Sequence, residues 1–159
     1  LAGFAELRRR GWIRRWGVSN FDTADMRELV ALPQGADCAA NQVYYSLGRR
    51  GVEFDLLPWM RERHMPLMAY CPVDQGALAG PRAPTGLREI AARHAASPAQ
   101  VALAALLAQD GVIAIPKAVQ ATHLRENWAA RAIEFDEADR RAIDLAFPPP
   151  RRRTPLAMS

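Results

Sequence analysis

Polar side chains follow each of four short apolar runs that resemble β-strands. Ligands of parallel β/α folds bind at the carboxyl ends of the strands, so we expect these side chains to share one face. They are Ser19, Asn20, Asn41, Gln42, the segment 70–75 and Lys117. Amides, hydroxyls and one tyrosine suit an uncharged amide ring stacked on Tyr70. A phosphate would fit near Lys117 and the helix N-terminus that follows it.

The same positions are poor in groups that transfer protons, since Asp74 is their only carboxylate. Lys117 is the only lysine among 21 lysine and arginine residues. An alternative is therefore a Schiff-base aldolase-type barrel with Lys117 as the amine nucleophile, although a neighbouring phosphate would keep that amine charged. Cys38 and Cys71 lack the spacing of metal ligands, and we expect no metal site and reduced thiols in the cytoplasm.

Length and composition indicate one water-soluble domain. The chain has 159 residues, of which 50% are hydrophobic and 24% charged. A complete β/α barrel needs about 250 residues, so only part of one fits here. No apolar run approaches the roughly 20 residues that span a bilayer, which predicts no membrane partner. The formal net charge is +4, but the basic residues are scattered and not interleaved with aromatics, so we expect no nucleic-acid partner.

Strand-like and helix-like patterns alternate along the chain, which predicts parallel β/α units. We expect strands over residues 13–18, 38–45, 66–70 and 112–115, with helices after each. Asp22, Ser97 and Asp136 are predicted N-caps, because an acidic residue or glutamine follows each of them three residues later. The long Pro- and Gly-rich loop over 71–86 favours a functional role.

Five segments stand in the order and spacing found in aldo-keto reductases. They are GVSNF at 17–21, NQV at 41–43, AYCP at 69–72, IPKA at 115–118 and LREN at 124–127. The FPPP ending at 147–150 resembles bacterial members that reduce small aldehydes such as methylglyoxal. The resemblance implies the C-terminal half of a TIM-type (β/α)8 barrel. Residues 1–147 would supply strands five to eight, and residues 148–159 a Pro/Arg-rich tail.

The resemblance implies a nicotinamide site on the first three strands. Ser19, Asn20 and Gln42 match residues that hold the nicotinamide carboxamide in the family, and Tyr70 matches the tyrosine that stacks on the ring. Stacking presents one ring face, which determines which hydride leaves. The loop that follows would wrap the pyrophosphate through Cys71, Pro72, Val73, Gln75 and Gly76. Cys71 stands where the family usually has serine.

The fourth strand and its helix would hold the adenosine end. Lys117 matches the lysine at the ribose 2′-phosphate, and Glu126 and Asn127 match residues that contact adenine. Ala118 stands where serine is common, and His123 stands where an arginine often completes the phosphate clamp. We therefore expect NADPH as the cofactor, with a weakened preference and NADH as the alternative.

The catalytic aspartate, tyrosine, lysine and histidine of the family come from the first half of the barrel, so no catalytic residue is assigned to this chain. The expected function is the cofactor-binding half of an NAD(P)H-dependent reductase of aldehydes and ketones. Its expected partners are a small carbonyl substrate and the missing N-terminal half-barrel, without which the fragment would be inactive. The alternative is a dinucleotide-binding module without catalysis.

Overall fold

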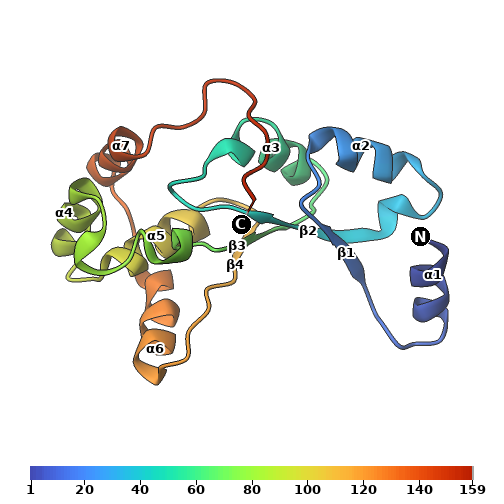
Figure 1. Cartoon of the computed structure of the whole chain (residues 1–159), viewed down its shortest axis with the longest axis horizontal. Helices are drawn as coiled ribbons and strands as arrows, with labels where there is room; N and C mark the ends of the chain where they lie inside the picture. Colours follow the sequence, from blue (N-terminus) through green and yellow to red (C-terminus); the bar gives the residue numbers. More distant parts are fainter. Residues whose placement is uncertain (159) are drawn as a thin grey trace.

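The computed structural model describes residues 1–158; Ser159, the last residue of the predicted tail, lies outside them. The described chain contains four strands and seven α-helices, with at least one helix after each strand (Figure 1). In chain order they are α1 (Ala2–Arg9), β1 (Trp16–Ser19), α2 (Thr23–Ala31), β2 (Cys38–Tyr44), α3 (Leu56–Arg61), β3 (Leu67–Tyr70), α4 (Thr85–Arg93), α5 (Pro98–Leu107), β4 (Val112–Ala114), α6 (Ala121–Ala129) and α7 (Glu137–Ala146). Short 3₁₀ turns occupy Gly35–Asp37, Gly51–Glu53, Asp74–Gly76, Gly80–Arg82 and Ala130–Ala132.

The strands form one sheet in the order β1-β2-β3-β4, and every neighbouring pair is parallel. Tyr44 pairs with Tyr70, so β2 and β3 end level, and Ser19 at the end of β1 pairs with Gln42, two residues before the end of β2. The predicted α/β fold with parallel units is confirmed, and the strand boundaries differ from the predicted ones by at most three residues. This register places the expected polar side chains along one edge of the sheet.

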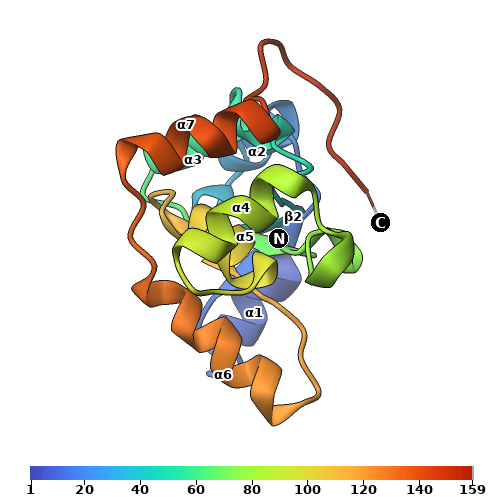
Figure 2. The ribbon, with the colours of Figure 1, turned by 90° about the vertical axis from the view of Figure 1, so that its left-hand side faces the viewer.

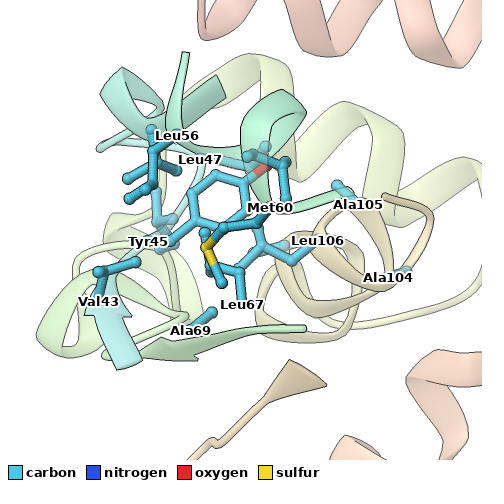
Figure 3. Close-up of a cluster of buried hydrophobic side chains, with 14 of the residues drawn as sticks. Val43, Tyr45, Leu47, Leu56, Met60, Leu67, Ala69, Ala104, Ala105 and Leu106 are labelled. Carbon is cyan, nitrogen blue, oxygen red and sulfur yellow. The ribbon is translucent and has the colours of Figure 1, made fainter. Parts of the chain in front are cut away.

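One face of the sheet packs against helices, and the other is open. Leu67 and Ala69 of β3 are fully buried, whereas Met68 and Tyr70, which alternate with them, are only half-buried. The buried side chains join those of β2, α3 and α5 in the main core, which includes Tyr45, Met60 and Leu106 (Figure 3). In Figure 2, α4, α5 and α7 lie on one side of the molecule, and α6 lies below them.

Local sequence signals explain where several helices begin. The Asp22 side chain accepts hydrogen bonds from the backbone N–H groups of Ala24 and Asp25. The Asp25 carboxylate accepts from the backbone N–H of Asp22, which completes a capping box. Ser97 and Gln100 form the same box at α5, which has Pro98 in its first turn. Both predicted boxes are confirmed.

The third predicted box is only half formed. Asp136 accepts a hydrogen bond from the Asp139 N–H at 2.8 Å, but the Asp139 carboxylate accepts none from the backbone N–H of Asp136. It is buried and instead accepts from Arg93 at 2.5 Å and lies 2.6 Å from His94 Nε2. The charge-assisted contacts with Arg93 and His94 therefore stabilise the Asp139 carboxylate more than the local hydrogen bond of the capping box would.

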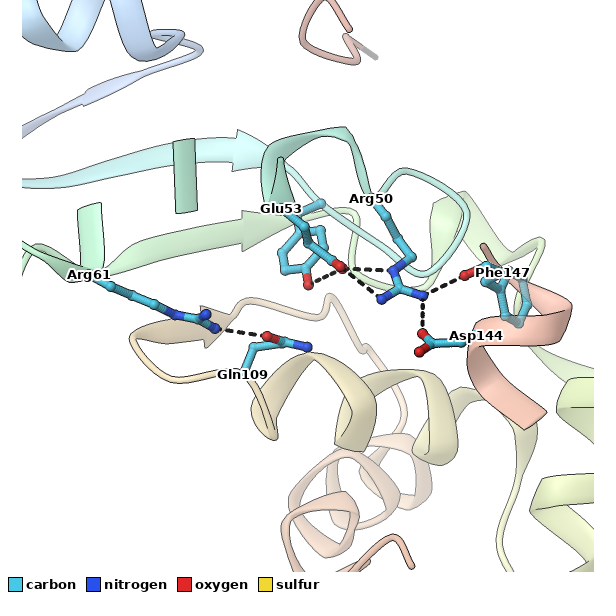
Figure 4. A network of polar contacts seen from close by, with 7 residues as sticks. Arg50, Glu53, Arg61, Gln109, Asp144 and Phe147 are labelled. Carbon is cyan, nitrogen blue, oxygen red and sulfur yellow. Dashed lines mark hydrogen bonds and ion pairs between the residues drawn. The ribbon is translucent and has the colours of Figure 1, made fainter. Parts of the chain in front are cut away.

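Arg50 ties the loop after β2 to the C-terminal helix (Figure 4). Its guanidinium donates twice to the Glu53 carboxylate, at 2.8 Å for each bond, and once to Asp144 at 2.7 Å. Tyr45 donates its hydroxyl to Glu53 at 2.7 Å from inside the core. The side chains of Arg50 and Glu53 are only 10% and 14% exposed, so this pair is largely withdrawn from solvent.

The C-terminal tail returns across the molecule and is held at two points. Arg153 lies 2.8 Å from Asp22 and 3.3 Å from Asp55, and Leu156 packs against the core. No helix within residues 1–158 has the length and apolar character to cross a membrane. The division at residue 147 between barrel and tail stays a prediction.

Candidate functional site

The ends of β1 and β2 are joined through one carbonyl group. The Gln42 carbonyl accepts from the Asn20 backbone N–H and from the Ser19 hydroxyl, each at 2.9 Å. These bonds place Ser19 and Asn20 next to the Gln42 backbone at the carboxyl edge of the sheet. Ser19 and Gln42 also line an open hollow of about 460 Å³, together with Gly17 and Met68 on the uncovered face.

Tyr70 completes this group from β3. Its hydroxyl donates to Asn20 Oδ1 at 3.1 Å, and its ring is half-buried at the strand end. Asn20 adopts φ = 59°, a left-handed conformation that asparagine tolerates better than most residues. Four of the residues expected at a nicotinamide ring are thus linked by hydrogen bonds, with the Tyr70 hydroxyl bonded to the Asn20 side chain and Asn20 and Ser19 bonded to the Gln42 backbone.

Asn41 does not belong to this group. It is fully buried, its amide donates to the Phe21 carbonyl at 2.7 Å, and its oxygen accepts from the Phe21 N–H at 3.5 Å. Both ends of the side chain are therefore satisfied by backbone. Asn41 anchors the turn that follows Asn20 and presents no polar atom to a ligand.

A second contact, not anticipated from the sequence, links β2 to the loop after β3. Tyr44 donates its hydroxyl to Asp74 Oδ1 at 2.6 Å, and Arg49 lies 3.7 Å from the same oxygen. Burial and then the bond to Asp74 raise the pKa of Tyr44 to about 12. The rings of Tyr44 and Tyr70 lie 5.3 Å apart and are tilted by 36°. The strand pairing of Tyr44 with Tyr70 explains this contact, but their spacing in the sequence gives no signal for it.

Gly48 is required by the same contact. A Cβ atom at this position would meet Asp74 Oδ2 at 2.6 Å, closer than side chains tolerate. The absence of a side chain lets the Asp74 carboxylate approach the loop after β2. Tyr44, Gly48 and Asp74 therefore hold two neighbouring loops of the carboxyl edge in fixed relation.

The loop after β3 folds back on itself in an unusual conformation. Cys71, Asp74, Gln75 and Gly76 all have positive φ, at 49°, 50°, 54° and 93°. Backbone bonds from Gly76 to Val73 and from Asp74 to Cys71 close the loop, and Pro72 is buried beneath it. Non-glycine residues held at positive φ cost free energy and cluster at ligand-binding segments. The predicted pyrophosphate loop thus has a defined, compact shape.

Lys117 and the residues of α6 form a second group, beyond β4. Lys117 and His123 are exposed, whereas Ala118, Glu126 and Asn127 are half-buried. No hydrogen bond or ion pair within residues 1–158 joins this group to Ser19, Asn20, Gln42 or Tyr70. The two groups share an edge of the sheet because β4 lies beside β3.

The start of α6 and the hollow behind it are open to ligands. Gln120, the N-cap of α6, makes no side-chain bond to the first turn, which leaves backbone N–H groups for an anion. A hollow of about 310 Å³ lies between Pro116, Leu124, Asn127 and Trp128. The exposure of Lys117 argues against the aldolase alternative, since amine nucleophiles are activated by desolvation in apolar pockets.

Four parallel β/α units with polar side chains gathered at the carboxyl edge define part of a β/α-barrel fold. A model of the aldo/keto reductase family matches residues 1–146. The chain therefore belongs to the aldo/keto reductase family. The predicted fold class, four units from the C-terminal half of a TIM-type (β/α)8 barrel, is confirmed.

Individual relatives agree with this assignment. The chain is 46% identical over 164 residues to methylglyoxal reductase YeaE of Escherichia coli (strain K12), which covers 99% of the chain and 56% of that protein. It superimposes with a TM-score of 0.91 and 40% identity on an aldo/keto reductase from Klebsiella pneumoniae in complex with NADP and acetate, over 98% of the chain and 56% of that structure. A thermostable aldo-keto reductase, Tm1743, in complex with the inhibitor epalrestat superimposes with a TM-score of 0.84 and 37% identity. That match covers 92% of the chain and 53% of the Tm1743 structure. The chain spans about half the length of these relatives.

Proposed function

We propose that this chain is the cofactor-binding half of an NAD(P)H-dependent aldo-keto reductase that reduces small aldehydes and ketones to alcohols. The observation that carries the proposal is the bonded group at the carboxyl edge, where Tyr70 donates to Asn20 and both Asn20 and Ser19 donate to Gln42. A half-buried aromatic ring bonded to the Asn20 side chain, at the strand ends where Ser19 and Gln42 also lie, suits a nicotinamide carboxamide. The relative that is crystallised with NADP supports this choice of cofactor.

The residues fit the group that the family binds. Ser19, Asn20 and Gln42 would hold the carboxamide, and Tyr70 would lie against the ring. The loop Cys71, Pro72, Val73, Gln75 and Gly76 would follow the pyrophosphate, and Lys117 with the open start of α6 would take the 2′-phosphate. Glu126 and Asn127 would contact adenine, and His123 and Ala118 would complete the pocket. Bound there, the reduced nicotinamide supplies the hydride that the carbonyl carbon accepts.

The chain's own part in the reaction is orientation. Tyr70 is held by Asn20, and Tyr44 holds the loop after β3 through Asp74, so the ring face and the phosphate loop are positioned before the cofactor arrives. Preorganisation of this kind lowers the entropic cost of reaching a reactive geometry. The proton that the product oxygen takes up would come from the other half of the protein, which we propose contains the catalytic tetrad.

The test is carbonyl-dependent oxidation of NADPH by the intact protein that contains this segment. Methylglyoxal is the first substrate to try, because a relative named as a methylglyoxal reductase is 46% identical. We expect NADPH absorbance to fall only when the carbonyl is added, and the rate to collapse in Tyr70→Ala. Tight binding of NADPH with no turnover of any small aldehyde would favour the non-catalytic dinucleotide module instead.

A further inference from the structure

Arginines from three separate stretches of the sequence meet at the amino ends of β1, β2 and β3. Arg8 lies in α1, Arg14 and Arg15 directly precede β1, and Arg63 lies before β3. The sequence shows them scattered over more than 50 positions, but a parallel sheet collects the amino ends of its strands at one edge. They line one cavity of about 680 Å³, within the range of small-molecule sites.

The charges in this cavity are not balanced by the protein. Asp37 is its only acidic lining residue, and Asp37 is paired with Arg8. Arg14 and Arg15 form no ion pair with any of residues 1–158. Arg63 lies 3.4 Å from Glu62, but that carboxylate is 74% exposed and lies outside the cavity lining, so solvent screens the pair. Arg14, Arg15 and Arg63 therefore line a shared hollow, and none of the three pairs with an acidic residue of that lining.

One of these arginines is held in place before any ligand binds. The Arg63 guanidinium lies 4.0 Å from the centre of the Trp59 ring and donates to the Trp59 carbonyl at 3.2 Å. Stacking on an aromatic ring orients the planar group and leaves its other N–H donors free. His64, the next residue, also lines the cavity and adds a ring nitrogen.

We propose that this cavity binds a small anion that carries two or more phosphate groups. Guanidinium groups match phosphate oxygens in pairs, and a cleft lined by one sign of charge concentrates the opposite ion. Like charges brought together repel, so a polyanion stabilises the cavity by supplying the missing countercharge. The site is at the opposite end of the strands from Ser19 and Tyr70, so it takes a different ligand molecule from the one proposed at the carboxyl edge.

Calorimetric titration of the intact protein with inorganic pyrophosphate tests this inference. NADPH is present at saturation, so that the proposed nucleotide site is filled. We expect saturable binding that weakens at least tenfold in Arg14→Gln/Arg15→Gln. The matched control, Arg27→Gln/Arg152→Gln, removes the same charge from exposed positions outside the cavity and should stay within twofold of the unsubstituted protein.

Three results would overturn the proposal. The first is no saturable binding of pyrophosphate. The second is equal weakening in the test and control variants, which would mean that overall charge alone attracts the anion. The third is binding to duplex DNA in preference to pyrophosphate, lost in Arg14→Gln/Arg15→Gln, which would make the cavity part of a nucleic-acid surface. Loss of NADPH binding in an experiment without pyrophosphate would contradict the proposed function and leave this cavity untouched.

Discussion

Tyr70 at the end of β3 donates its hydroxyl to the side-chain oxygen of Asn20, 50 positions earlier in the chain and two strands away in the sheet. This bond joins the aromatic face to the amides that would hold a nicotinamide ring. It also helps to hold Asn20 in its left-handed conformation, because the bond fixes the side-chain oxygen there.

Two substitutions distinguish the contribution of the Tyr70 ring to NADPH binding from that of its hydroxyl. Tyr70→Phe keeps the aromatic face and removes one hydrogen bond, so we expect the Kd for NADPH to rise about fivefold, equivalent to about 1 kcal/mol. Tyr70→Ala removes the stacking face as well and should weaken binding much further. Fluorescence titration of the intact protein measures both values. Equal affinity in Tyr70→Ala and the unsubstituted protein would mean that no ring stacks there.

The largely buried Arg50–Glu53 pair should contribute strongly to stability where the loop after β2 meets α7. Arg50→Met leaves the Glu53 carboxylate without its bidentate partner, and we expect the free energy of unfolding to fall by about 3 kcal/mol. Denaturant unfolding measures the change. The control is Arg141→Met, whose pair with Glu137 is 77% and 69% exposed, and which should cost no more than about 0.5 kcal/mol. Similar losses in both variants would refute the special role of Arg50.

Asp139 gives the protein an acid-sensitive contact. Burial raises its pKa, but the bonds from Arg93 and His94 outweigh burial and hold the pKa below its ordinary value. The folded state therefore binds this proton less readily than the unfolded chain does. The stability that results is complete above the unfolded pKa, about 3.9, and is lost as the pH falls through the lower folded value.

We therefore expect the acid loss of stability to be shallower in Asp139→Asn than in the unsubstituted protein. Unfolding free energies measured from about pH 6 to about pH 3 provide the slopes. Asp110→Asn, at an exposed position, is the matched control and should retain the full slope. An unchanged slope in Asp139→Asn would show that other carboxylates control acid unfolding.

The isolated segment should not behave as an ordinary monomer. Within residues 1–158, β1 and β4 each have one unpaired edge, and Ile113 and Ile115 are 44% and 37% exposed around the last strand. Open parallel edges and uncovered apolar faces favour association. Sedimentation and thermal unfolding of residues 1–159 alone should show self-association or a low Tm. A stable monomer over a wide concentration range would contradict this prediction.

Local sequence patterns predicted most helices and strands, and the features that were predicted wrongly or missed depend on contacts between distant parts of the chain. The caps at Asp22 and Ser97 are local, since each bonds to backbone three residues away, and both form as predicted. Asp139 has the same spacing from its cap, but a buried pairing with Arg93 and His94 removes its carboxylate. Helix α1 was not predicted, and in the structure it has no side-chain cap and buries no residue.

The candidate site likewise contains residues that the sequence predicted and contacts that it did not. Strand-end positions and family resemblance indicated Ser19, Asn20, Gln42 and Tyr70, and the structure joins these four. The Tyr44–Asp74 bond spans 30 positions, and the arginine cavity depends on three strand ends. Neither follows from spacing along the chain, because the packing of separate β/α units creates them.

The central claim is that this half of the barrel contains a working cofactor site, and nucleotide titration tests it most directly. NADPH and NADH are each titrated into the intact protein and its Lys117→Met variant, followed by intrinsic fluorescence, with Arg27→Met as an exposed control. The proposal predicts tighter binding of NADPH than of NADH, a difference that Lys117→Met reduces and Arg27→Met preserves. Failure of a correctly folded protein to bind either nucleotide would contradict the assignment of Tyr70 and Lys117.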